Sequence, residues 1–388
     1  MNIIVYTFPF RGHSMQAIKI ANYLSSKCHK VIVDANSNFF HYISPNIVKQ
    51  ECLYEFFEFE DDSKKDNILN CAEGVLVTTN RYANQFDQNV DLIIYDSMAY
   101  WGKYIADKYN IKSISLFTIQ PFDKQHFNDY AFEYLRGYTS KYATQKDFFR
   151  NIHIYQVVAK KKFNLTDDFS FDDFFCARGL YNVVLLPKSV CKFANELEDS
   201  YSAFSPMLEC NSEQPDKNDS IYIATGSMIS NLDLLISCID SLLCFEKDMH
   251  ISSGKHTEFL QNKYSNYKNI NFYEFAPQEK LLKQASVFIT HGGTNSMCEA
   301  IASKTPMIVI PLVNDEFLNA EMIVQSGIGI ELENDLSVIK NNLSYAYESI
   351  IQNNSYAEKI STIAKEINYN RVLKIIDEIV EGDNYEKL

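Results

Sequence analysis

Short apolar runs alternate with helical patterns along the chain, and this alternation constrains the fold more than any other feature. Ile, Val and Leu dominate several runs, as is typical of strands buried on both faces of a parallel sheet. In a helical pattern such as 14–26, the apolar residues share one face. Eight runs qualify as strands: "NIIVYTF" (2–8), "KVIVDA" (30–35), "DLIIYD" (91–96), "SISLF" (113–117), "SIYIAT" (220–225), "NINFYEF" (269–275), "SVFIT" (286–290) and "PMIVI" (306–310). Because strands and helices alternate in both halves, the sequence predicts an α/β protein with two doubly wound domains.

A polar stretch without apolar periodicity separates the two halves. It spans residues 209–219 and contains Pro215. We therefore expect a first domain over 1–208, a linker over 209–219, and a second domain over 220–388 that ends in helices. The segment 122–175 is less regular and dense in Phe and Tyr, so it is expected to be an insertion in the first domain.

Charge and composition exclude several classes of protein. The 388 residues carry a formal net charge of −14, which disfavours broad contact with nucleic acid or anionic lipid. The cysteines show no zinc-binding spacing, and no secretory leader or membrane-spanning run is evident. A cytoplasmic protein is expected. The one basic cluster, "AKKKF" (159–163), follows an apolar stretch and fits either a solvated basic face, the more common case, or a membrane-surface helix.

The stretch "FITHGGTNSMCEA" (288–300) joins a predicted strand to a predicted helix through a histidine and two glycines. Gly292 and Gly293 permit a tight turn and close backbone approach. Free N–H groups at the start of the helix make an anion site, to which His291 can add a donor. Asn295 and Ser296 lie in the first helical turn. One turn on, Glu299 can accept hydrogen bonds from two ribose hydroxyls. A phosphate pocket beside a ribose and a simple turn with a capping Asn both fit this pattern.

A second histidine follows the first predicted strand, in "VYTFPFRGHSMQ" (5–16). His13 is expected just before the helix that begins at Ser14. Asp96 ends the strand at 91–96, so both residues are placed at the carboxyl edge of one sheet, where ligands of such folds collect. A histidine oriented by a carboxylate can act as a general base near neutral pH. A structural histidine is the alternative, since the sequence does not establish that the two residues touch.

The chain resembles the inverting, nucleotide-sugar-dependent UDP-glycosyltransferases of the GT-B fold, a family that includes plant and macrolide-modifying enzymes. The main match is "FAPQEKLLKQASVFITHGGTNSMCEAIASKTPMIVIPLVNDEFLNAEMIVQSGIGIEL" (275–332), which follows the family's donor signature. Weaker matches are "RGH" (11–13), "YDSMAYWGKYIA" (95–106) and "IATGS" (223–227). The resemblance implies two Rossmann-like domains that face a central cleft, the first for the acceptor and the second for the donor.

The resemblance also implies a role for each matching residue. His13 would be the catalytic base and Asp96 its partner. In the implied donor site, Phe275 would stack on the base, the backbone at Ala276 and the Gln278 side chain would lie near the nucleoside, and Glu299 would bind the ribose. Asp315 and Glu316 would face the sugar. The diphosphate would be bound by Ser227, His291, Gly293, Asn295 and Ser296. The co-substrate is a UDP-sugar, and neither a metal nor another cofactor is expected.

Three positions depart from the family's pattern. Gln16 stands where a proline usually follows the histidine by three residues, which is expected to alter packing more than chemistry. Phe275 replaces the more usual Trp. Asp315 and Glu316 replace an Asp-Gln pair, which bears on the sugar. Two ionised carboxylates only accept hydrogen bonds, so they suit a neutral hexose and repel a hexuronic acid.

The sequence thus predicts a glycosyltransferase that moves a neutral hexose, with UDP-glucose as the first candidate donor. The acceptor is expected to be a small apolar molecule such as a natural product, and UDP-glucuronate a poor donor. Two alternatives stay open: a nucleotide-sugar epimerase of the same fold, and a non-catalytic relative that binds a partner. Nucleic acid is not an expected partner, and the charge balance disfavours membrane contact.

Overall fold

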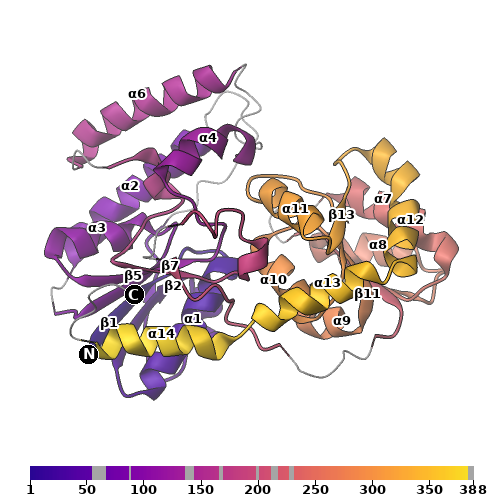
Figure 1. Cartoon of the computed structure of the whole chain (residues 1–388), viewed down its shortest axis with the longest axis horizontal. Coiled ribbons are helices and arrows are strands. Elements are labelled where there is room, and N and C mark those ends of the chain that lie inside the picture. Colours follow the sequence, from indigo (N-terminus) through magenta and orange to yellow (C-terminus); the bar gives the residue numbers. More distant parts are fainter. Residues whose placement is uncertain are drawn as a thin grey trace. The chain divides into compact units, whose positions relative to one another are not determined.

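The computed structural model describes residues 1–54, 67–86, 89–135, 144–165, 169–197, 201–210, 217–226 and 231–382. The chain divides into two compact units, each built around a parallel sheet (Figure 1). Unit 1 comprises Met1–Leu186, Phe193–Met207 and Tyr369–Leu388, and unit 2 comprises Pro187–Lys192 and Leu208–Asn368.

Unit 1 holds a seven-stranded parallel sheet in the order β3-β2-β1-β4-β5-β6-β7. Its strands are β1 (Asn2–Tyr6), β2 (Lys30–Ala35), β3 (Val48–Glu51), β4 (Leu92–Asp96), β5 (Lys112–Phe117), β6 (Tyr181–Val184) and β7 (Tyr201–Ser202). Its helices are α1 (Arg11–Ser26), α2 (Asn67–Gln85), α3 (Tyr100–Tyr109), α4 (Lys124–Tyr134), α6 (Gln145–Phe163) and α14 (Tyr369–Glu381), with short 3₁₀ turns at Ser37–Tyr42 and Phe171–Phe174. The sheet core is aliphatic, and α1 and α14 both contribute to it.

Unit 2 holds a six-stranded parallel sheet in the order β10-β9-β8-β11-β12-β13. Its strands are β8 (Ser220–Ala224), β9 (Met249–Ser252), β10 (Ile270–Tyr273), β11 (Ala285–Thr290), β12 (Met307–Val309) and β13 (Gly329–Glu331). Its helices are α7 (Leu232–Leu242), α8 (Thr257–Lys263), α9 (Gln278–Gln284), α10 (Thr294–Ala302), α11 (Glu316–Gln325), α12 (Leu336–Gln352) and α13 (Ser355–Ile363), with 3₁₀ turns at Lys188–Val190, Leu243–Phe245, Gly254–His256 and Ala364–Glu366.

All eight predicted strands are present, and both domains are doubly wound as predicted. The strands that the sequence did not indicate are short or polar; β3 at one edge of its sheet reads Val-Lys-Gln-Glu and carries little apolar signal. The predicted C-terminal helices are also present, as α12, α13 and α14.

The observed units differ from the expected division at 1–208, 209–219 and 220–388. The last helix, α14, packs with unit 1, because Val372, Ile376 and Ile379 are buried in the core of that unit's sheet. The segment Pro187–Lys192 groups instead with unit 2. Much of the expected linker, residues 211–216, lies outside the described residues.

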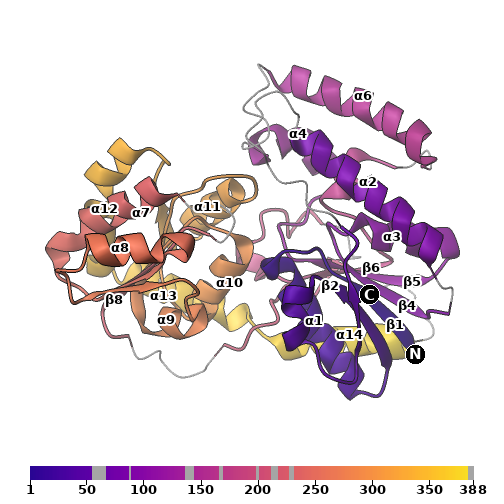
Figure 2. The same ribbon diagram turned by 180° about the vertical axis from the view of Figure 1, so that it is seen from behind.

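The aromatic segment between β5 and β6 is an insertion, as predicted, and it contains α4 and α6. Phe122, Phe127 and Phe171 are buried and pack on one another or on neighbouring rings. Most of these aromatics therefore form a core of their own, whereas Tyr130 is exposed. Figures 1 and 2 place α6 on the side of this insertion farthest from the sheet of unit 1.

Candidate catalytic and donor-binding residues

Both sheets carry their candidate residues at the same topological position. Each sheet reverses its winding direction between two central strands, β1 and β4 in unit 1, and β8 and β11 in unit 2. Ligands of open α/β sheets bind outside the carboxyl ends of strands at such a switch point. His13 and Asp96 lie there in unit 1, and His291 lies there in unit 2.

In unit 1 the structure brings His13 and Asp96 into contact. The Nδ1 atom of His13 lies 3.0 and 3.1 Å from the two carboxylate oxygens of Asp96. His13 is mostly buried and Asp96 fully so. The Asp96 carboxylate also accepts the backbone N–H of Met98 at 3.0 Å. The contact with Asp96 places the ring proton on Nδ1 and leaves the lone pair on Nε2, as a general base requires.

The helix α1 begins at Arg11, so His13 lies in its first turn rather than before it. This corrects the expected start at Ser14 by three residues. From this first turn the His13 ring contacts the Asp96 carboxylate at the end of β4.

Thr118 belongs to the same cluster, and the sequence prediction missed it. Its hydroxyl donates to Asp96 Oδ2 at 2.7 Å and lies 2.7 Å from His13 Nδ1. Thr118 follows β5, and β5 pairs with β4 such that Leu116 lies opposite Asp96. The rule that placed Asp96 at the carboxyl edge of the sheet also applies to this neighbouring strand, so the signal was present.

Gln16, which replaces the family's proline, has a structural contact. Its side chain is buried, and its Oε1 atom accepts the backbone N–H of Met207 at 2.8 Å. Lys19, one turn on, donates to the carbonyl oxygen of Met207 at 2.8 Å. The departure from the pattern therefore affects packing, because two side chains of α1 hold Met207, the last residue of the Phe193–Met207 segment of unit 1.

In unit 2 the glycines after β11 are required by the geometry of the turn. Gly292 has a φ of +92°, a left-handed conformation that favours glycine. A Cβ atom at Gly293 would lie 2.7 Å from Nε2 of His291, and one at Gly226 would lie 3.2 Å from the same ring. The His291 ring therefore rests against two backbone segments that lack side chains, at the start of α10.

Burial sets the charge of this histidine. Desolvation lowers the pKa of His291 to about 4, so the ring is neutral at neutral pH. Its Nε2 atom lies 3.8 Å from Oε1 of Glu316. The structure therefore favours a neutral hydrogen-bond donor at His291. The first turn of α10 adds backbone N–H groups and the positive end of the helix dipole.

Four of the predicted donor residues form one hydrogen-bonded network. Both oxygens of Glu299 accept amide N–H groups, one from Gln278 at 2.6 Å and one from Asn295 at 2.7 Å. Gln278 also donates to Ser296 at 3.2 Å and accepts the hydroxyl of Tyr222 at 3.0 Å. The sequence did not single out Tyr222, whose position within a near-continuous apolar strand hides its polar atom. The alternative of a simple capping Asn does not hold, because the helix N-cap is Gly293 and Asn295 bonds to Glu299.

The Phe275 side chain is as exposed as a ring that stacks on a ligand would be. It is 88% exposed, the most exposed of the large hydrophobic side chains that the structure describes. Such exposure of an aromatic ring costs free energy unless a ligand covers it. The adjacent Ala276 carbonyl accepts the backbone N–H of Gln278 at 2.9 Å, which fixes the backbone beside the ring.

Asp315 and Glu316 lie at the start of α11, and each accepts hydrogen bonds from nearby groups. Asp315 accepts the Thr294 hydroxyl at 3.0 Å. Glu316 accepts the backbone N–H groups of Leu312 and Val313 on a single oxygen, at 2.7 and 2.9 Å. Burial, reinforced by the charge of Asp315, raises the pKa of Glu316 to about 8. The sequence argument treated both carboxylates as ionised, whereas Glu316 is protonated at neutral pH.

Asn319, which sequence reasoning missed, connects this pair to the turn that follows β11. It is fully buried and donates to the Gly292 carbonyl and to the Thr294 hydroxyl, both at 2.9 Å. Its position one turn after Asp315 on α11 is the only signal in the sequence. Ser227, the remaining predicted donor residue, lies outside the described residues.

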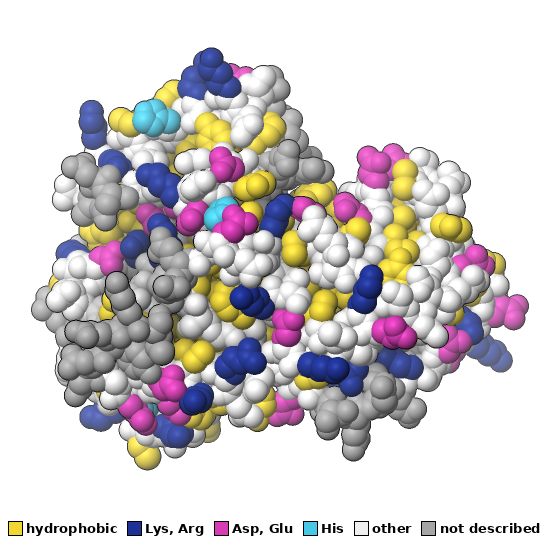
Figure 3. Space-filling view, viewed as in Figure 1, with side chains coloured by type: hydrophobic (Ala, Val, Ile, Leu, Met, Phe, Trp, Pro, Cys, Tyr) yellow, Lys and Arg dark blue, Asp and Glu magenta, His cyan; other side chains and the backbone are white. Residues whose placement is uncertain are grey.

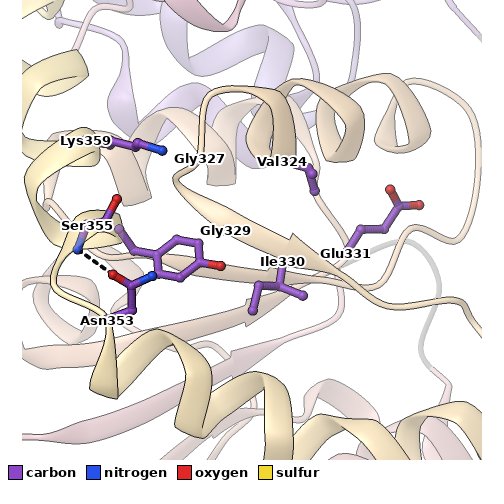
Figure 4. A pocket seen from close by; sticks show the side chains of 9 residues that line it. Val324, Gly327, Gly329, Ile330, Glu331, Asn353, Ser355 and Lys359 are labelled. Atoms are coloured by element: carbon purple, nitrogen blue, oxygen red, sulfur yellow. Dashed lines mark hydrogen bonds between the residues drawn. The ribbon is translucent and has the colours of Figure 1, made fainter.

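A separate hollow of about 450 Å³ lies elsewhere in unit 2, beside β13 and α13 (Figure 4). Lys359 lies along Gly327 on one wall, and Asn353 accepts the backbone N–H of Ser355 on another. None of the predicted donor residues lines this hollow, so it is distinct from the network around Glu299.

Comparisons with known proteins agree with this geometry. Residues 221–380 match the family described as "UDP-glucoronosyl and UDP-glucosyl transferase". The uncharacterized UDP-glucosyltransferase YojK of Bacillus subtilis is 23% identical, and the alignment covers 94% of this chain and 93% of that protein. Among solved structures, the calicheamicin glycosyltransferase CalG4 aligns with a TM-score of 0.76 at 16% identity, over 99% of each chain. The kitacinnamycin glycosyltransferase aligns with a TM-score of 0.74 at 19% identity, over 97% of this chain and 98% of that one.

These similarities define the class of protein. The fold is GT-B, and the resemblance to UDP-glycosyltransferases is confirmed. The chain is a nucleotide-sugar-dependent glycosyltransferase: residues 221–380 match the family model, and nearly the whole chain is similar to one bacterial UDP-glucosyltransferase.

Proposed function

We propose that this enzyme transfers a neutral hexose, with inversion, from a UDP-sugar to a hydroxyl group of a small apolar acceptor. UDP-glucose is the first candidate donor; UDP-N-acetylglucosamine and dTDP-sugars are the alternatives. The observation that carries the proposal is the contact of His13 with the buried Asp96, which orients a general base at the switch point of one sheet. The acceptor class is supported by CalG4 and the kitacinnamycin enzyme, both named for natural products.

Unit 1 activates the acceptor in this proposal. The Nε2 atom of His13 takes the hydroxyl proton as the acceptor oxygen bonds to the anomeric carbon. The imidazolium that forms is stabilised by Asp96, whose carboxylate is held by Thr118 and the Met98 N–H. A positioned base of this kind contributes roughly 10²–10⁴-fold to the rate.

Unit 2 holds the donor and stabilises the leaving group. Phe275 stacks on the base, the Ala276 backbone and Gln278 lie beside the nucleoside, and Glu299 accepts the ribose hydroxyls. The bond from the anomeric carbon to the diphosphate oxygen breaks as the new bond forms. The first turn of α10 stabilises the negative charge that develops on the departing diphosphate. The residues that take part are neutral His291, Gly293, Asn295, Ser296 and Ser227. A single displacement of this kind inverts the anomeric centre.

The leaving-group charge is thus met by a helix N-terminus and hydrogen-bond donors, and we expect no metal requirement. Transfer should persist at its full rate in excess EDTA, measured as UDP release after the protein has been dialysed against the chelator. An unchanged rate on adding back Mg²⁺ or Mn²⁺ is the matching control. A strict need for either cation at the chemical step would contradict this part of the mechanism.

The whole proposal is tested by incubating the protein with UDP-glucose and a panel of phenolic and macrocyclic acceptors. Release of UDP together with a β-glycoside from the α-linked donor is expected. An epimerised nucleotide sugar without UDP release would instead identify an epimerase. Tight UDP-glucose binding with neither product would identify a non-catalytic relative.

A further inference from the structure

The inner face of helix α6 (Gln145–Phe163) packs against the rest of unit 1. Phe148, Ile152 and Ala159 are buried against the rest of the insertion. The hydroxyl of Tyr155 donates to Glu73 of α2 at 3.2 Å. These contacts attach the helix to unit 1. They account for the apolar residues on its inner face but not for those on its outer face.

The outer face of α6 carries a second apolar stripe. Ile154, Val157 and Val158 are 54%, 44% and 55% exposed. Their spacing of three and four residues places them on one side of the helix. A contiguous group of three exposed β-branched side chains on one helix is unusual for a surface that meets only water.

Cations flank this stripe at both ends. Two cations precede the stripe, Lys146 and Arg150, and three follow it, Lys160, Lys161 and Lys162. The one acidic residue of the helix is Asp147. Five positive charges less one negative charge give +4 for α6, in a chain whose net charge is −14. Figure 3 shows dark blue basic, yellow hydrophobic and cyan histidine side chains together over α6.

Nearby acidic side chains do not cancel this charge. Asp147 lies 3.6 Å from Arg150, and Glu73 of α2 pairs with Lys162. Arg150 and Lys162 nevertheless stay 69% and 57% exposed. The outer face therefore combines aliphatic side chains with exposed cations.

We propose that the outer face of α6 docks unit 1 on an anionic lipid surface. An amphipathic helix with aliphatic residues between cations lies in the interface plane, with its apolar side chains among the lipid headgroups and its charges near anionic phosphates. The acidic remainder of the molecule is repelled by the same surface, which confines the contact to this helix. Among the described residues no helix is long and apolar enough to cross a bilayer, so the attachment is peripheral. The proposal does not depend on the donor or acceptor chemistry above.

The test is co-sedimentation of the full chain with phosphatidylcholine vesicles that contain, or lack, 30% phosphatidylglycerol. Native protein should sediment with the anionic vesicles and stay in solution with the neutral ones. R150Q/K161Q should weaken binding by roughly 25-fold, at roughly five-fold for each cation removed. K255Q/K268Q, two exposed lysines of unit 2, makes the same change in net charge and should bind as the native protein does.

The apolar contribution is tested by I154S/V158S, which should weaken binding by about ten-fold or more at constant charge. Val48→Ser removes an equally exposed aliphatic residue from β3 and is the matched control. Thermal unfolding midpoints equal to that of the native protein establish that each variant folds. The proposal is overturned if native protein ignores anionic vesicles, or if both α6 variants bind them as tightly as the native protein.

Discussion

The two candidate regions occupy the same position on two similar sheets, yet they are assembled differently. In unit 1 the base cluster combines His13, Asp96 and Thr118, which come from the first turn of α1 and from the ends of β4 and β5. In unit 2 the donor residues come mainly from one continuous segment, 275–319. The first region depends on tertiary structure, and the second on local chain geometry.

The two regions also differ in how complete they are. Asp96 is fully buried, and its carboxylate is hydrogen-bonded to the His13 ring, the Thr118 hydroxyl and a backbone N–H group. Phe275 in the donor region is 88% exposed, and the oxygens of Glu299 bond to side-chain amides that ribose hydroxyls can replace. We infer that the base is pre-organised, whereas the donor region rearranges its hydrogen bonds when it binds a nucleotide.

The largest effect is expected for His13→Ala. Turnover should fall by roughly 10²–10⁴-fold, because the acceptor hydroxyl loses its base. Initial rates of UDP release with a fixed acceptor measure this loss. His41→Ala, a histidine in the 3₁₀ turn of unit 1, is the control. Unchanged turnover in His13→Ala would remove the base from the mechanism.

Glu299→Ala should act on the other region and on a different parameter. In the proposed complex Glu299 accepts two ribose hydroxyls, so its removal should weaken UDP-glucose binding by roughly 10²-fold, about the lower end of what two hydrogen bonds to a charged group contribute. The KM for the donor should rise accordingly. Glu258→Ala, an exposed carboxylate on α8, should leave the KM unchanged. A fall in kcat alone would place Glu299 with the reacting atoms instead.

Thr118→Val is expected to have a smaller effect, because it removes one hydroxyl from the base cluster and keeps the shape of the side chain. Loss of one hydrogen bond of about 1–1.5 kcal/mol should lower kcat by about ten-fold. Thr118→Ser should restore most of the rate, which a purely steric role would not require. Equal rates for Val and Ser variants would show that the hydroxyl does not hold Asp96.

The smallest effect concerns the sugar and depends on pH. Glu316 is protonated below a pKa of about 8, so its charge appears only as the pH rises through that value. Discrimination of UDP-glucose over UDP-glucuronate should therefore grow several-fold between about pH 7 and pH 9, as a second carboxylate joins Asp315. Competition between the two donors measures the ratio. Glu316→Gln should flatten this dependence, and a native ratio that favours glucuronate would exclude these residues from the sugar site.

How much of this could be predicted differs between the two regions, for a physical reason. The candidate donor residues of α10 and the preceding turn follow one another in sequence, so glycine conformation and helix position marked them as one candidate site, and the family resemblance supplied their proposed roles. His13 and Asp96 needed the added assumption that neighbouring parallel strands share an edge, and the same assumption applied to β5 would have found Thr118. The protonation of Glu316 could not be predicted, because it arises from burial that only the folded chain defines.

The domain boundary illustrates the same limit. The apolar periodicity of α14 indicates a helix but not which sheet its buried face meets. Val372 and Ile376 pack in the core of unit 1, although α14 follows unit 2 in the chain. Gln16 is a comparable case, since a buried amide that holds the Met207 backbone leaves no pattern in the sequence.

If unit 2 binds the donor and unit 1 supplies the base, calorimetric titration with UDP should separate the two roles. Native protein and His13→Ala should bind UDP with the same affinity, whereas Glu299→Ala should bind it roughly 10²-fold more weakly. The measurement needs no knowledge of the acceptor. Native protein that does not bind UDP, or His13→Ala that loses UDP affinity while Glu299→Ala keeps it, would contradict this division between the two units.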